Sequence, residues 1–302
     1  MREDAITRHG YADAVVAAVV ELATRGGRRR PWLVGLSGLQ GSGKSTLAAQ
    51  LVAAARRERI DALAMSIDDF YLGRAERLRL ARDVHPLLAT RGVPGTHDVG
   101  LLLDTLDGLH TARPNRPACV PRFDKGRDTR LPPSRWRRVE QRPDLVILEG
   151  WCVGVPPQSS SALRRPLNSL ERDEDSDARW RNWVNMELSL TYVPLWQHLD
   201  RLVMLQAPSF DVVLRWRDEQ ERALRTRHAP RAMSPAVLRH FLMYYERLSR
   251  QALRTLPAIA DLRVVLDPDR CVRRLVRSSP SAEGGHSASS PLPRARSGER
   301  VG

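Results

Sequence analysis

Lysine is nearly absent from this sequence of 302 residues. Lysine and arginine together number 49, yet Lys44 and Lys125 are the two lysines, so arginine carries almost all of the positive charge. A general drift in composition towards arginine explains most of this imbalance. A lysine that persists against such a drift indicates a need for a compact ammonium, which the planar guanidinium of arginine does not replace. Lys44 and Lys125 are therefore the first candidates for functional cations.

Cysteine is also scarce, and long apolar runs are missing. Cys119, Cys152 and Cys271 are odd in number and follow no C-x-x-C spacing, which predicts free thiols in a reducing cytoplasm. No apolar run approaches the roughly 20 residues that a membrane-spanning helix needs. The first residues include Glu3 and Asp4 and do not resemble a signal peptide. We therefore expect a cytoplasmic protein without a membrane partner.

Acidic residues are in the minority, since 35 of them face 49 basic residues, and the formal net charge is +14. Nucleic acid is the first partner that such a balance suggests. However, the basic residues are spread along the chain instead of gathered in one block, and no nucleic-acid-binding motif is visible. We therefore expect a small-molecule partner in place of nucleic acid.

Residues 38–46, with the sequence GLQGSGKST, organise the rest of the chain. They fit the P-loop pattern G-x-x-x-x-G-K-[ST], in which glycines let several backbone N–H groups point at one phosphate. The apolar run 32–36 before them predicts a buried strand, and residues 47–55 predict a helix whose positive N-terminal end favours an anion. We expect Lys44 to reach the β- and γ-phosphates of ATP and Ser45 to ligate Mg²⁺. The residues predicted to bind ATP are Gly38, Gly41, Ser42, Gly43, Lys44, Ser45 and Thr46.

Acidic residues follow or end two further predicted strands. Residues 60–67 lead into Asp68 and Asp69, and residues 144–150 contain Glu149. In a parallel sheet the carboxyl ends of the strands face one ligand crevice. Carboxylates at that place can act as a general base or hold Mg²⁺ and its water, although a helix cap alone would also explain the Asp-Asp pair. The predicted metal ligands are Ser45, Asp69 and Glu149.

Two turn-rich segments with mixed charge are candidates for holding an acceptor. In the first, residues 91–98, Asp98 would cap a helix predicted over 99–109. The second, residues 121–130, is either a solvated turn or a flap that accepts an anion. The residues predicted to bind the acceptor are Arg91, His97, Asp98, Lys125 and Arg127.

An arginine-rich helix is predicted over residues 209–228. Arg215 and Glu219 form an i,i+4 pair, which is typical of an ordinary surface helix. The functional interpretation is a lid, whose Arg215 and Arg217 would close over the phosphates, exclude water and stabilise the transferring charge.

Five predicted strands joined by helices indicate an α/β fold, a P-loop NTPase sandwich of three layers with a five-stranded parallel sheet and helices on both faces. The strands are predicted at residues 32–36, 60–67, 144–150, 200–206 and 262–266. We expect a single domain over residues 1–277 with its core at 31–267. Within it, the Pro-, Ser- and charge-rich stretch 156–178 predicts an exposed excursion. Residues 278–302 contain almost no apolar side chains and predict a disordered tail.

In this order, the motifs resemble those of one family, the plant-type D-glycerate 3-kinases and their bacterial kinase-like relatives. That family lies within the superfamily of phosphoribulokinase, uridine kinase and pantothenate kinase. The resemblance covers about residues 32–267, and although the P-loop alone is generic, the ordered set is specific. The segments that carry it are the P-loop, Ser66–Leu72, Arg91–Asp98, Pro121–Lys125, Ile147–Trp151, Val184–Asn185 and Arg215–Arg217.

The resemblance implies a kinase that uses ATP and Mg²⁺ to phosphorylate a small anionic acceptor, with D-glycerate and 3-phosphoglycerate as substrate and product. Asp68, two residues before Phe70, matches the general base of the superfamily, and Glu149 matches the acid associated with Mg²⁺. The implied catalytic residues are Lys44, Asp68, Arg215 and Arg217. Such a reaction depends mainly on positioning and charge neutralisation, and a carboxylate acceptor suits a pocket rich in arginine and lysine.

Other functions stay open at this point. The sequence has no N-K-x-D motif, which argues against a guanine-specific GTPase, and uridine would need aromatic residues near 91–98 to hold its base. Pantothenate is another carboxylate acceptor. From a different class, the chain could be a catalytically weak, nucleotide-binding regulator with a basic surface, although its acids at strand ends suit catalysis better.

Overall fold

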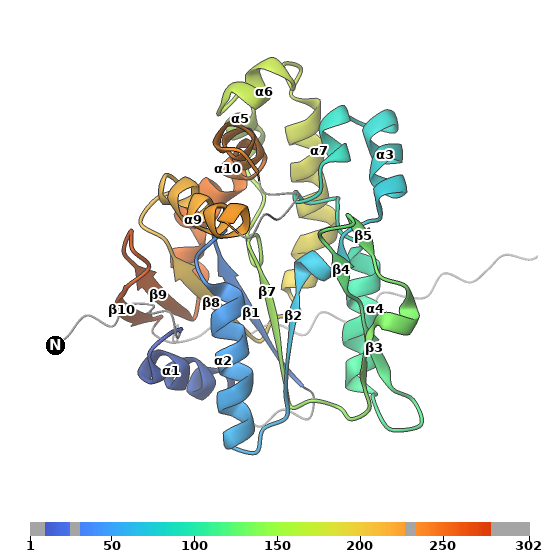
Figure 1. The fold of residues 1–302 in the computed structure, drawn as a ribbon, viewed down its shortest axis with the longest axis vertical. Helices are drawn as coiled ribbons and strands as arrows, with labels where there is room; N and C mark the ends of the chain where they lie inside the picture. Colours follow the sequence, from blue (N-terminus) through green and yellow to red (C-terminus); the bar gives the residue numbers. More distant parts are fainter. Residues whose placement is uncertain (1–9, 25–30, 227–232, 279–302) are drawn as a thin grey trace, which may run out of the picture.

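A sheet of six strands forms the centre of the described part of the molecule (Figure 1). The computed structural model describes residues 10–24, 31–226 and 233–278. The strands are β1 Trp32–Gly38, β2 Ala62–Ser66, β7 Leu145–Gly150, β8 Arg201–Gln206, β9 Leu262–Leu266 and β10 Val272–Arg277. They lie in the order β10-β9-β8-β1-β7-β2, and the first five in the chain pair in parallel. These five are the predicted strands, so the α/β sandwich with a parallel sheet is confirmed.

The sixth strand, β10, pairs antiparallel with β9 at the edge of the sheet, and the sequence pattern does not predict it. Its side chains are half-buried or exposed along its whole length, and three of them are the arginines Arg273, Arg274 and Arg277. An edge strand that carries charge discourages pairing with another chain. The sheet therefore continues to residue 277, ten residues beyond the predicted core. The sequence pattern misses β10 because this strand has few apolar residues.

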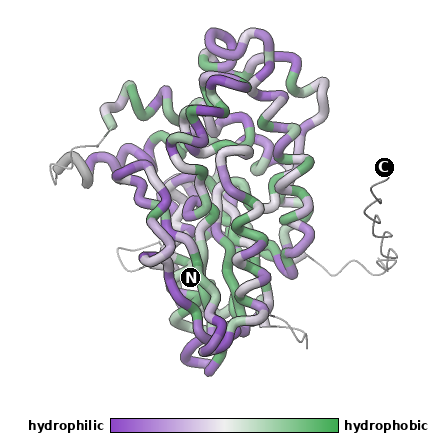
Figure 2. The backbone as a smooth tube through the Cα atoms, turned by 90° about the vertical axis from the view of Figure 1, so that its right-hand side faces the viewer, coloured by the Kyte–Doolittle hydropathy of each residue, from purple (hydrophilic) through white to green (hydrophobic). Residues whose placement is uncertain are grey.

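Helices cover both faces of this sheet. Their bounds are α1 Asp13–Thr24, α2 Lys44–Arg57, α3 Arg74–Asp83, α4 Val99–His110, α5 Ser160–Leu163, α6 Ser169–Asp173, α7 Arg179–Glu187, α8 Val193–Trp196, α9 Val212–Thr226 and α10 Pro235–Ile259. Neighbouring residues of a strand point to opposite sides, so Leu33 of β1 packs in one buried cluster with α4, while Val34 and Leu36 pack in another with α1 and α2. Figure 2 shows hydrophobic strands through the middle of the molecule.

Short elements connect these layers on the side where β2 ends the sheet. They are η1 Ile67–Phe70, η2 Pro86–Ala89, β3 Ala118–Val120, β4 Phe123–Asp124, β5 Thr129–Arg130, η3 Pro133–Arg135, β6 Arg137–Val139 and the π-helical turn η4 Leu188–Tyr192. Strands β4 and β5 pair as a small antiparallel hairpin, called the 123–130 hairpin below, and β3 pairs with β6. In Figure 1 the 123–130 hairpin and α9 lie on opposite sides of the upper end of the sheet.

The polar segment 156–178 packs against α10 and forms the short helices α5 and α6. Glu171 of α6 is fully buried. Its two carboxylate oxygens accept hydrogen bonds from Arg247 of α10, and one of them also accepts the backbone N–H of Leu167 at 2.7 Å. More than half of this segment is exposed, and the buried Glu171 is an exception because a helix far along the chain supplies the partners that this charge needs.

The Glu171–Arg247 pair generates a stability prediction. Arg247 is 11% exposed, so Glu171→Ala leaves a largely buried guanidinium without its partner. We expect the free energy of unfolding to fall by about 3 kcal/mol, as measured by urea unfolding followed by circular dichroism. Arg172→Gln is the matched control, because it breaks the exposed pair with Asp173 next in the chain and costs about 0.5 kcal/mol or less. Equal losses in the two variants would contradict the buried role of Glu171.

Several expectations fall on residues that lie outside the described ranges. These are the start of a helix that the apolar spacing predicts over residues 4–24, the tail from residue 279 onwards and the last two residues of the predicted lid helix. Within the described ranges, no helix combines the length and the apolar composition that crossing a bilayer requires.

Candidate active site

The P-loop connects β1 to α2 and forms a cradle of backbone N–H groups. Gly41 and Gly43 have φ angles of 80° and 91°, in the left-handed region that favours glycine. A Cβ on Gly41 would lie 2.7 Å from Cβ of Trp216 in α9, so this glycine also allows the close approach of that helix. Gly43 precedes α2 without a side-chain cap, which leaves the first N–H groups of a 14-residue helix for a ligand.

Orphaned polar groups inside the loop fit a phosphate ligand. The Gln40 side-chain amide, which lines the cavity described below, is buried and has no hydrogen-bond partner among the described residues. The buried Ser42 hydroxyl also lacks a partner there, but it does not line the cavity. Buried polar groups in folded proteins nearly always have partners. A loop with free donors at a helix N-terminus therefore fits the phosphates predicted for this motif.

Tyr11 is a residue of the site that the sequence interpretation misses. Its hydroxyl donates a buried hydrogen bond of 2.6 Å to the backbone carbonyl of Ser42, and its backbone N–H and carbonyl both bond to Gln50 of α2. In the sequence, Tyr11 is one apolar position of a predicted helix, and nothing there indicates a partner 31 residues away. The contact fixes the P-loop from the side opposite to its ligand.

A polar cavity of about 290 Å³ opens beside the P-loop. It is lined by Gln40, Gly41, Gly43, Lys44, Ser45, Thr46, Asp68, Lys125, Glu149, Gly150, Trp151, Arg217 and Gln220. The structure therefore brings together both lysines, two of the predicted acids and one of the predicted lid arginines. Burial lowers the pKa of the Lys44 ammonium, while Glu149 and Asp68 oppose that shift.

Ser45 and Glu149 form the part of the cavity that suits a divalent cation. The Ser45 hydroxyl donates a hydrogen bond of 2.7 Å to the Glu149 carboxylate, which is 8% exposed. A hydroxyl and a carboxylate are the hard oxygen ligands that Mg²⁺ prefers, and they lie beside the phosphate cradle. The chemistry of this donor pair thus fits the predicted Mg²⁺ site.

The structure separates Asp68 from Asp69. Asp68 lines the cavity, whereas the Asp69 carboxylate turns away and accepts the backbone N–H of Phe123 at 3.1 Å. Burial raises the pKa of Asp69, and its hydrogen bond to Phe123 opposes that shift. The prediction of Asp69 as a metal ligand is thus not supported, because the η1 turn points adjacent side chains in different directions. Asp69 anchors the 123–130 hairpin instead.

Both carboxylate oxygens of Asp68 have partners. The Tyr71 hydroxyl donates to Oδ1 at 2.9 Å, and Nζ of Lys125 lies 2.6 Å from Oδ2. Burial alone would raise the pKa of Asp68, but the charge and hydrogen bond of Lys125, with help from His97 and Tyr71, bring it below its ordinary value. Asp68 is therefore ionised at neutral pH and has a hydrogen-bond or ion-pair partner on each oxygen.

His97 is buried and packs against Tyr71, which contacts Asp68. Its ring stacks on that of Tyr71 with centroids 4.4 Å apart, and its Nδ1 lies 2.7 Å from the Tyr192 hydroxyl. That hydroxyl also accepts the backbone N–H of Gly95 at 3.0 Å, so Tyr192 holds the imidazole ring in place. Burial lowers the pKa of His97 to about 4, so the ring is neutral at pH 7. Its Nε2 is buried and has no partner among the described residues.

The other predicted acceptor residues are held in structural contacts outside the cavity lining. Asp98 caps α4 by accepting the Leu101 N–H at 2.9 Å, as predicted, and it also pairs with Arg130. Arg91 pairs with Asp128, and Arg127 is mostly exposed. The structure thus brings Lys125 into the cavity and His97 close behind it, and it does not bring Arg91, Asp98 or Arg127 there.

The two predicted lid arginines face different directions. Residues two positions apart on an α-helix are rotated by about 200° about its axis. Arg217 lines the cavity and is held by Gln220 and Glu221, both at 2.7 Å. Arg215 instead contacts the Pro268 carbonyl and Asp269 in the loop between β9 and β10. The prediction that both arginines reach the phosphates conflicts with this helical geometry, and the structure favours Arg217.

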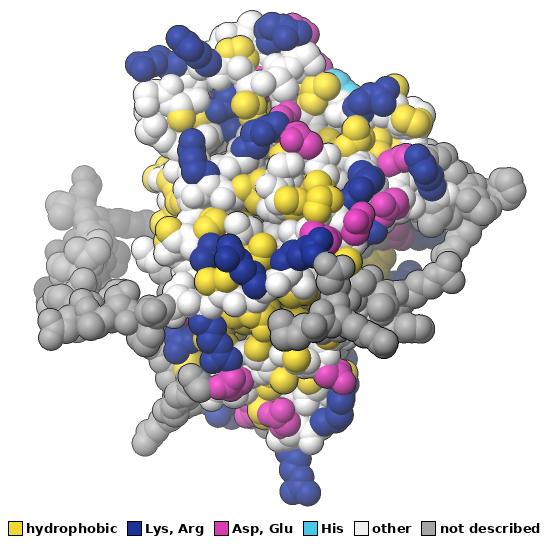
Figure 3. Space-filling view, turned by 90° about the vertical axis from the view of Figure 1, so that its left-hand side faces the viewer, with side chains coloured by type: hydrophobic (Ala, Val, Ile, Leu, Met, Phe, Trp, Pro, Cys, Tyr) yellow, Lys and Arg dark blue, Asp and Glu magenta, His cyan; other side chains and the backbone are white. Residues whose placement is uncertain are grey.

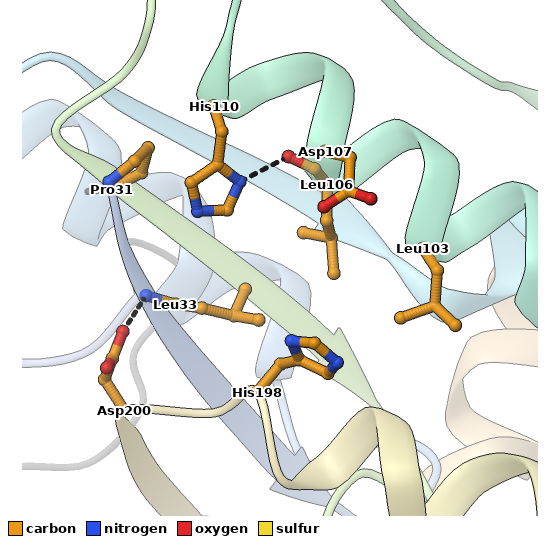
Figure 4. A pocket seen from close by; sticks show the side chains of 8 residues that line it. All are labelled: Pro31, Leu33, Leu103, Leu106, Asp107, His110, His198 and Asp200. Atoms are coloured by element: carbon orange, nitrogen blue, oxygen red, sulfur yellow. Dashed lines mark hydrogen bonds between the residues drawn. The ribbon is translucent and has the colours of Figure 1, made fainter. Parts of the chain in front are cut away.

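A second cavity, of about 200 Å³, lies at the opposite end of β1 (Figure 4). Its histidines and aspartates make it a candidate for chemistry, but two of these groups have structural partners. His110 donates from Nδ1 to the Leu106 carbonyl one turn earlier, and Asp200 accepts the backbone N–H of Leu33. The cavity contains no part of the P-loop and does not compete as the active site.

One further cluster has the composition of a metal site. Ligand atoms of His85, Asp175 and Asp177 lie within 4.8 Å of one another. However, Asp175 is buried against the guanidinium of Arg181 at 2.7 Å, and Nδ1 of His85 accepts the Leu87 N–H, which leaves its proton on Nε2. A cation would have to displace an existing positive charge, so this cluster is structural.

The arginines on the face shown in Figure 3 lie in separate places among acidic and apolar side chains. Many described arginines are paired with acids, including Arg222 with Asp218 and Arg273 with Asp267. A nucleic-acid site usually gathers its positive charge along one stripe. This face therefore gives no support to a nucleic-acid partner.

Tyr11 provides the test of the P-loop geometry. Tyr11→Phe removes one buried hydrogen bond and leaves the Ser42 carbonyl without that partner, which we expect to cost about 1–2 kcal/mol of stability. Because the affected carbonyl belongs to the phosphate cradle, the affinity for ATP should fall as well, measured by titration with a fluorescent ATP analogue. Tyr244→Phe, away from the loop, is the control. An unchanged affinity for ATP in Tyr11→Phe would contradict the role of this contact.

Known proteins with similar sequences include several kinases, although no family model matches this chain. The chain is 36% identical over 229 residues to an uncharacterized kinase, mug58, of Schizosaccharomyces pombe, a match that covers 72% of this chain and 79% of that protein. It is 30% identical over 248 residues to the chloroplastic D-glycerate 3-kinase of Arabidopsis thaliana, which covers 80% of this chain. The match spans about half, 51%, of the Arabidopsis protein.

Solved structures show the same fold. The D-glycerate 3-kinase from Cryptococcus neoformans superposes with a TM-score of 0.70 at 24% identity, over 88% of this chain and 97% of that one. The likeness extends over nearly the whole of that structure, so both molecules share one arrangement of sheet and helices.

Proposed function

Because the chain belongs to a family of P-loop kinases that includes mug58 and has D-glycerate 3-kinases among its relatives, we propose that it transfers the γ-phosphate of ATP to a hydroxyl of a small carboxylate-bearing acceptor. D-glycerate is the first candidate, with 3-phosphoglycerate as the product. The observation that carries this proposal is the cavity in which Asp68 and Lys125 lie together with the P-loop residues Lys44 and Ser45.

ATP would bind with its phosphates at the N-terminus of α2. The backbone of residues 38–46 supplies the N–H groups, Lys44 supplies a positive charge, and Arg217 faces the same cavity from α9. Ser45 and Glu149 would hold Mg²⁺, which when bound neutralises phosphate charge. Two cations and a helix N-terminus thus converge where negative charge gathers during transfer.

Asp68 would act as the general base. It is ionised, it lines the cavity, and Lys125 contacts it. A carboxylate in this place can accept the proton of an acceptor hydroxyl as that oxygen bonds to the γ-phosphorus. A base of this kind typically contributes a factor of about 10²–10⁴ to the rate.

The acceptor side of the cavity favours a small anion. Lys125 supplies a cation that is 60% exposed and contacts Asp68, and the buried Nε2 of His97 has no partner among the described residues. A carboxylate needs donors of this kind. The names of the Arabidopsis and Cryptococcus relatives point to D-glycerate among the acceptors with this chemistry.

A panel of acceptors tests the proposal. We expect the purified protein with Mg²⁺-ATP to release ADP with D-glycerate, and much less with L-glycerate, pantothenate, uridine or ribulose 5-phosphate. Asp68→Asn should lower kcat by about 10²-fold or more because the base is lost, and Lys44→Ala should abolish turnover. Asp69→Asn is the matched control, since it keeps an acceptor for the Phe123 N–H and should change kcat much less. If another acceptor alone is phosphorylated, the kinase stands and the D-glycerate assignment fails; if none is, a nucleotide-binding regulator becomes the better explanation.

The two arginines of α9 give a second test. We expect Arg217→Gln to lower kcat by about tenfold or more, because it removes a cation that faces the transferring phosphate. Arg215→Gln should have a much smaller effect, since its partners lie in the loop between β9 and β10. Steady-state kinetics at saturating acceptor separate the two variants. Equal losses would indicate that both arginines reach the phosphates during turnover, as the sequence pattern suggested.

A further inference from the structure

The contact between Lys125 and Asp68 presents a chemical problem for the proposed base. Nζ of Lys125 lies 2.6 Å from one carboxylate oxygen of Asp68, and Tyr71 donates to the other. An ion pair of this kind stabilises the carboxylate and makes it a weaker base. Asp68 therefore has to lose a partner before it can take a proton from a hydroxyl.

Lys125 is the partner that can leave. Its side chain is 60% exposed, whereas Asp68 is 25% exposed, and the ammonium sits on a flexible four-carbon stem. Tyr71, in contrast, is 3% exposed and stacked on His97. Rotation of the Lys125 side chain would therefore break its contact with Asp68 and leave the Tyr71 hydrogen bond in place.

The backbone that carries Lys125 is fixed. Asp128, near the end of the 123–130 hairpin, pairs with the buried Arg77 and with Arg91. At the start of the hairpin, the Phe123 N–H is held by Asp69. These anchors come from different elements on both sides of Lys125, so the hairpin does not have to open as a flap for the ammonium to move.

We propose that Lys125 guards the base: it holds Asp68 while the acceptor site is empty, and the carboxylate of an incoming acceptor draws the ammonium away and frees Asp68. Lys44 belongs to the P-loop and Arg217 to α9, whereas Lys125 contacts the proposed base, so Lys125 is the lysine that would meet the acceptor. The same side chain thus selects an anionic acceptor and permits proton transfer once that acceptor is bound. The selection of a carboxylate rests on the proposed function, whereas the restraint on Asp68 does not depend on which acceptor is used.

The ion pair between Lys125 and Asp68, called the guard below, also slows ATP hydrolysis when no acceptor is bound. In that side reaction, a water oxygen forms a bond to the γ-phosphorus, the bond from the γ-phosphorus to the bridging oxygen breaks, and ADP leaves with that electron pair. The proton of the water passes to Asp68 and then to solvent. With Lys125 on Asp68, this proton has no available acceptor, so hydrolysis without an acceptor is slow.

The experiment measures ADP release without any acceptor in the wild type, in Lys125→Met and in Lys125→Met combined with Asp68→Asn. We expect Lys125→Met to hydrolyse ATP about tenfold faster than the wild type, because an uncovered base accelerates attack by water. The double variant should return to the low rate. Arg122→Met, which removes an exposed cation three residues away and outside the cavity lining, is the matched control.

Reactions with different acceptors then test the role of Lys125 independently of the identity of the natural substrate. We expect Lys125→Met to lower kcat/KM for D-glycerate by about tenfold to a hundredfold, the worth of a lost charge-assisted contact, and to leave kcat/KM for uncharged glycerol unchanged or higher. D-lactate keeps the carboxylate and lacks the 3-hydroxyl, so it should stimulate ATP hydrolysis by the wild type and not by Lys125→Met.

The outcomes separate the two proposals. If Lys125→Met hydrolyses ATP no faster than the wild type, and loses the same factor with D-glycerate and glycerol, the guard is overturned. If the wild type phosphorylates no carboxylate acceptor, yet Lys125→Met hydrolyses ATP faster in a manner that requires Asp68, the guard is supported and the glycerate assignment fails.

Discussion

The parallel register of β1, β7 and β2 is the constraint on which the site depends. Leu36 and Ser66 both lie level with Glu149 of the strand between them, and Ser37 lies level with Gly150. The three chains therefore leave the sheet at the same height and at the same edge. The P-loop follows β1, Asp68 follows β2, and Glu149 is the residue before the last in β7. Residues more than 100 positions apart therefore share one cavity. A shift of one residue would turn every one of these side chains to the other face.

Charge balance within that cavity explains the arrangement of its residues. Lys44 and Lys125 are cations, Asp68 and Glu149 are anions, and each sign lies within reach of the other. Each of these carboxylates has a donor within the cavity: Lys125 contacts Asp68, and the neutral Ser45 hydroxyl donates to Glu149. Phosphates and an acceptor carboxylate would bring new negative charge that competes for the same cations. The site can therefore respond to its ligands through exchange of partners, with little movement of the backbone.

Supporting contacts keep these exchanges local. Tyr11 holds the P-loop at the Ser42 carbonyl, Asp69 and Asp128 hold the 123–130 hairpin, and Tyr192 contacts Nδ1 of His97. Most of these residues are polar and buried or half-buried, and their partners come from elements distant in sequence. They contribute nothing to a motif, yet they determine which atoms of the motif residues face the cavity.

Local patterns in the sequence predict the parallel strands, the P-loop and the acids beside it. These patterns are apolar runs, glycine spacing and the position of a carboxylate at a strand end. They left β10 undetected, since an edge strand shields few side chains and can carry arginines. The sequence also predicted too many ligand-binding residues in the segments 91–98 and 209–228. Arg91, Asp98 and Arg215 have suitable chemistry, yet they contact other parts of the chain.

Tertiary structure alone decided which of two adjacent aspartates faces the cavity, which of two lid arginines does, and that Lys125 contacts Asp68. Those choices depend on the direction in which a side chain leaves a turn or a helix and on partners 50 or more residues away. Residue types and their spacing carry no record of such contacts.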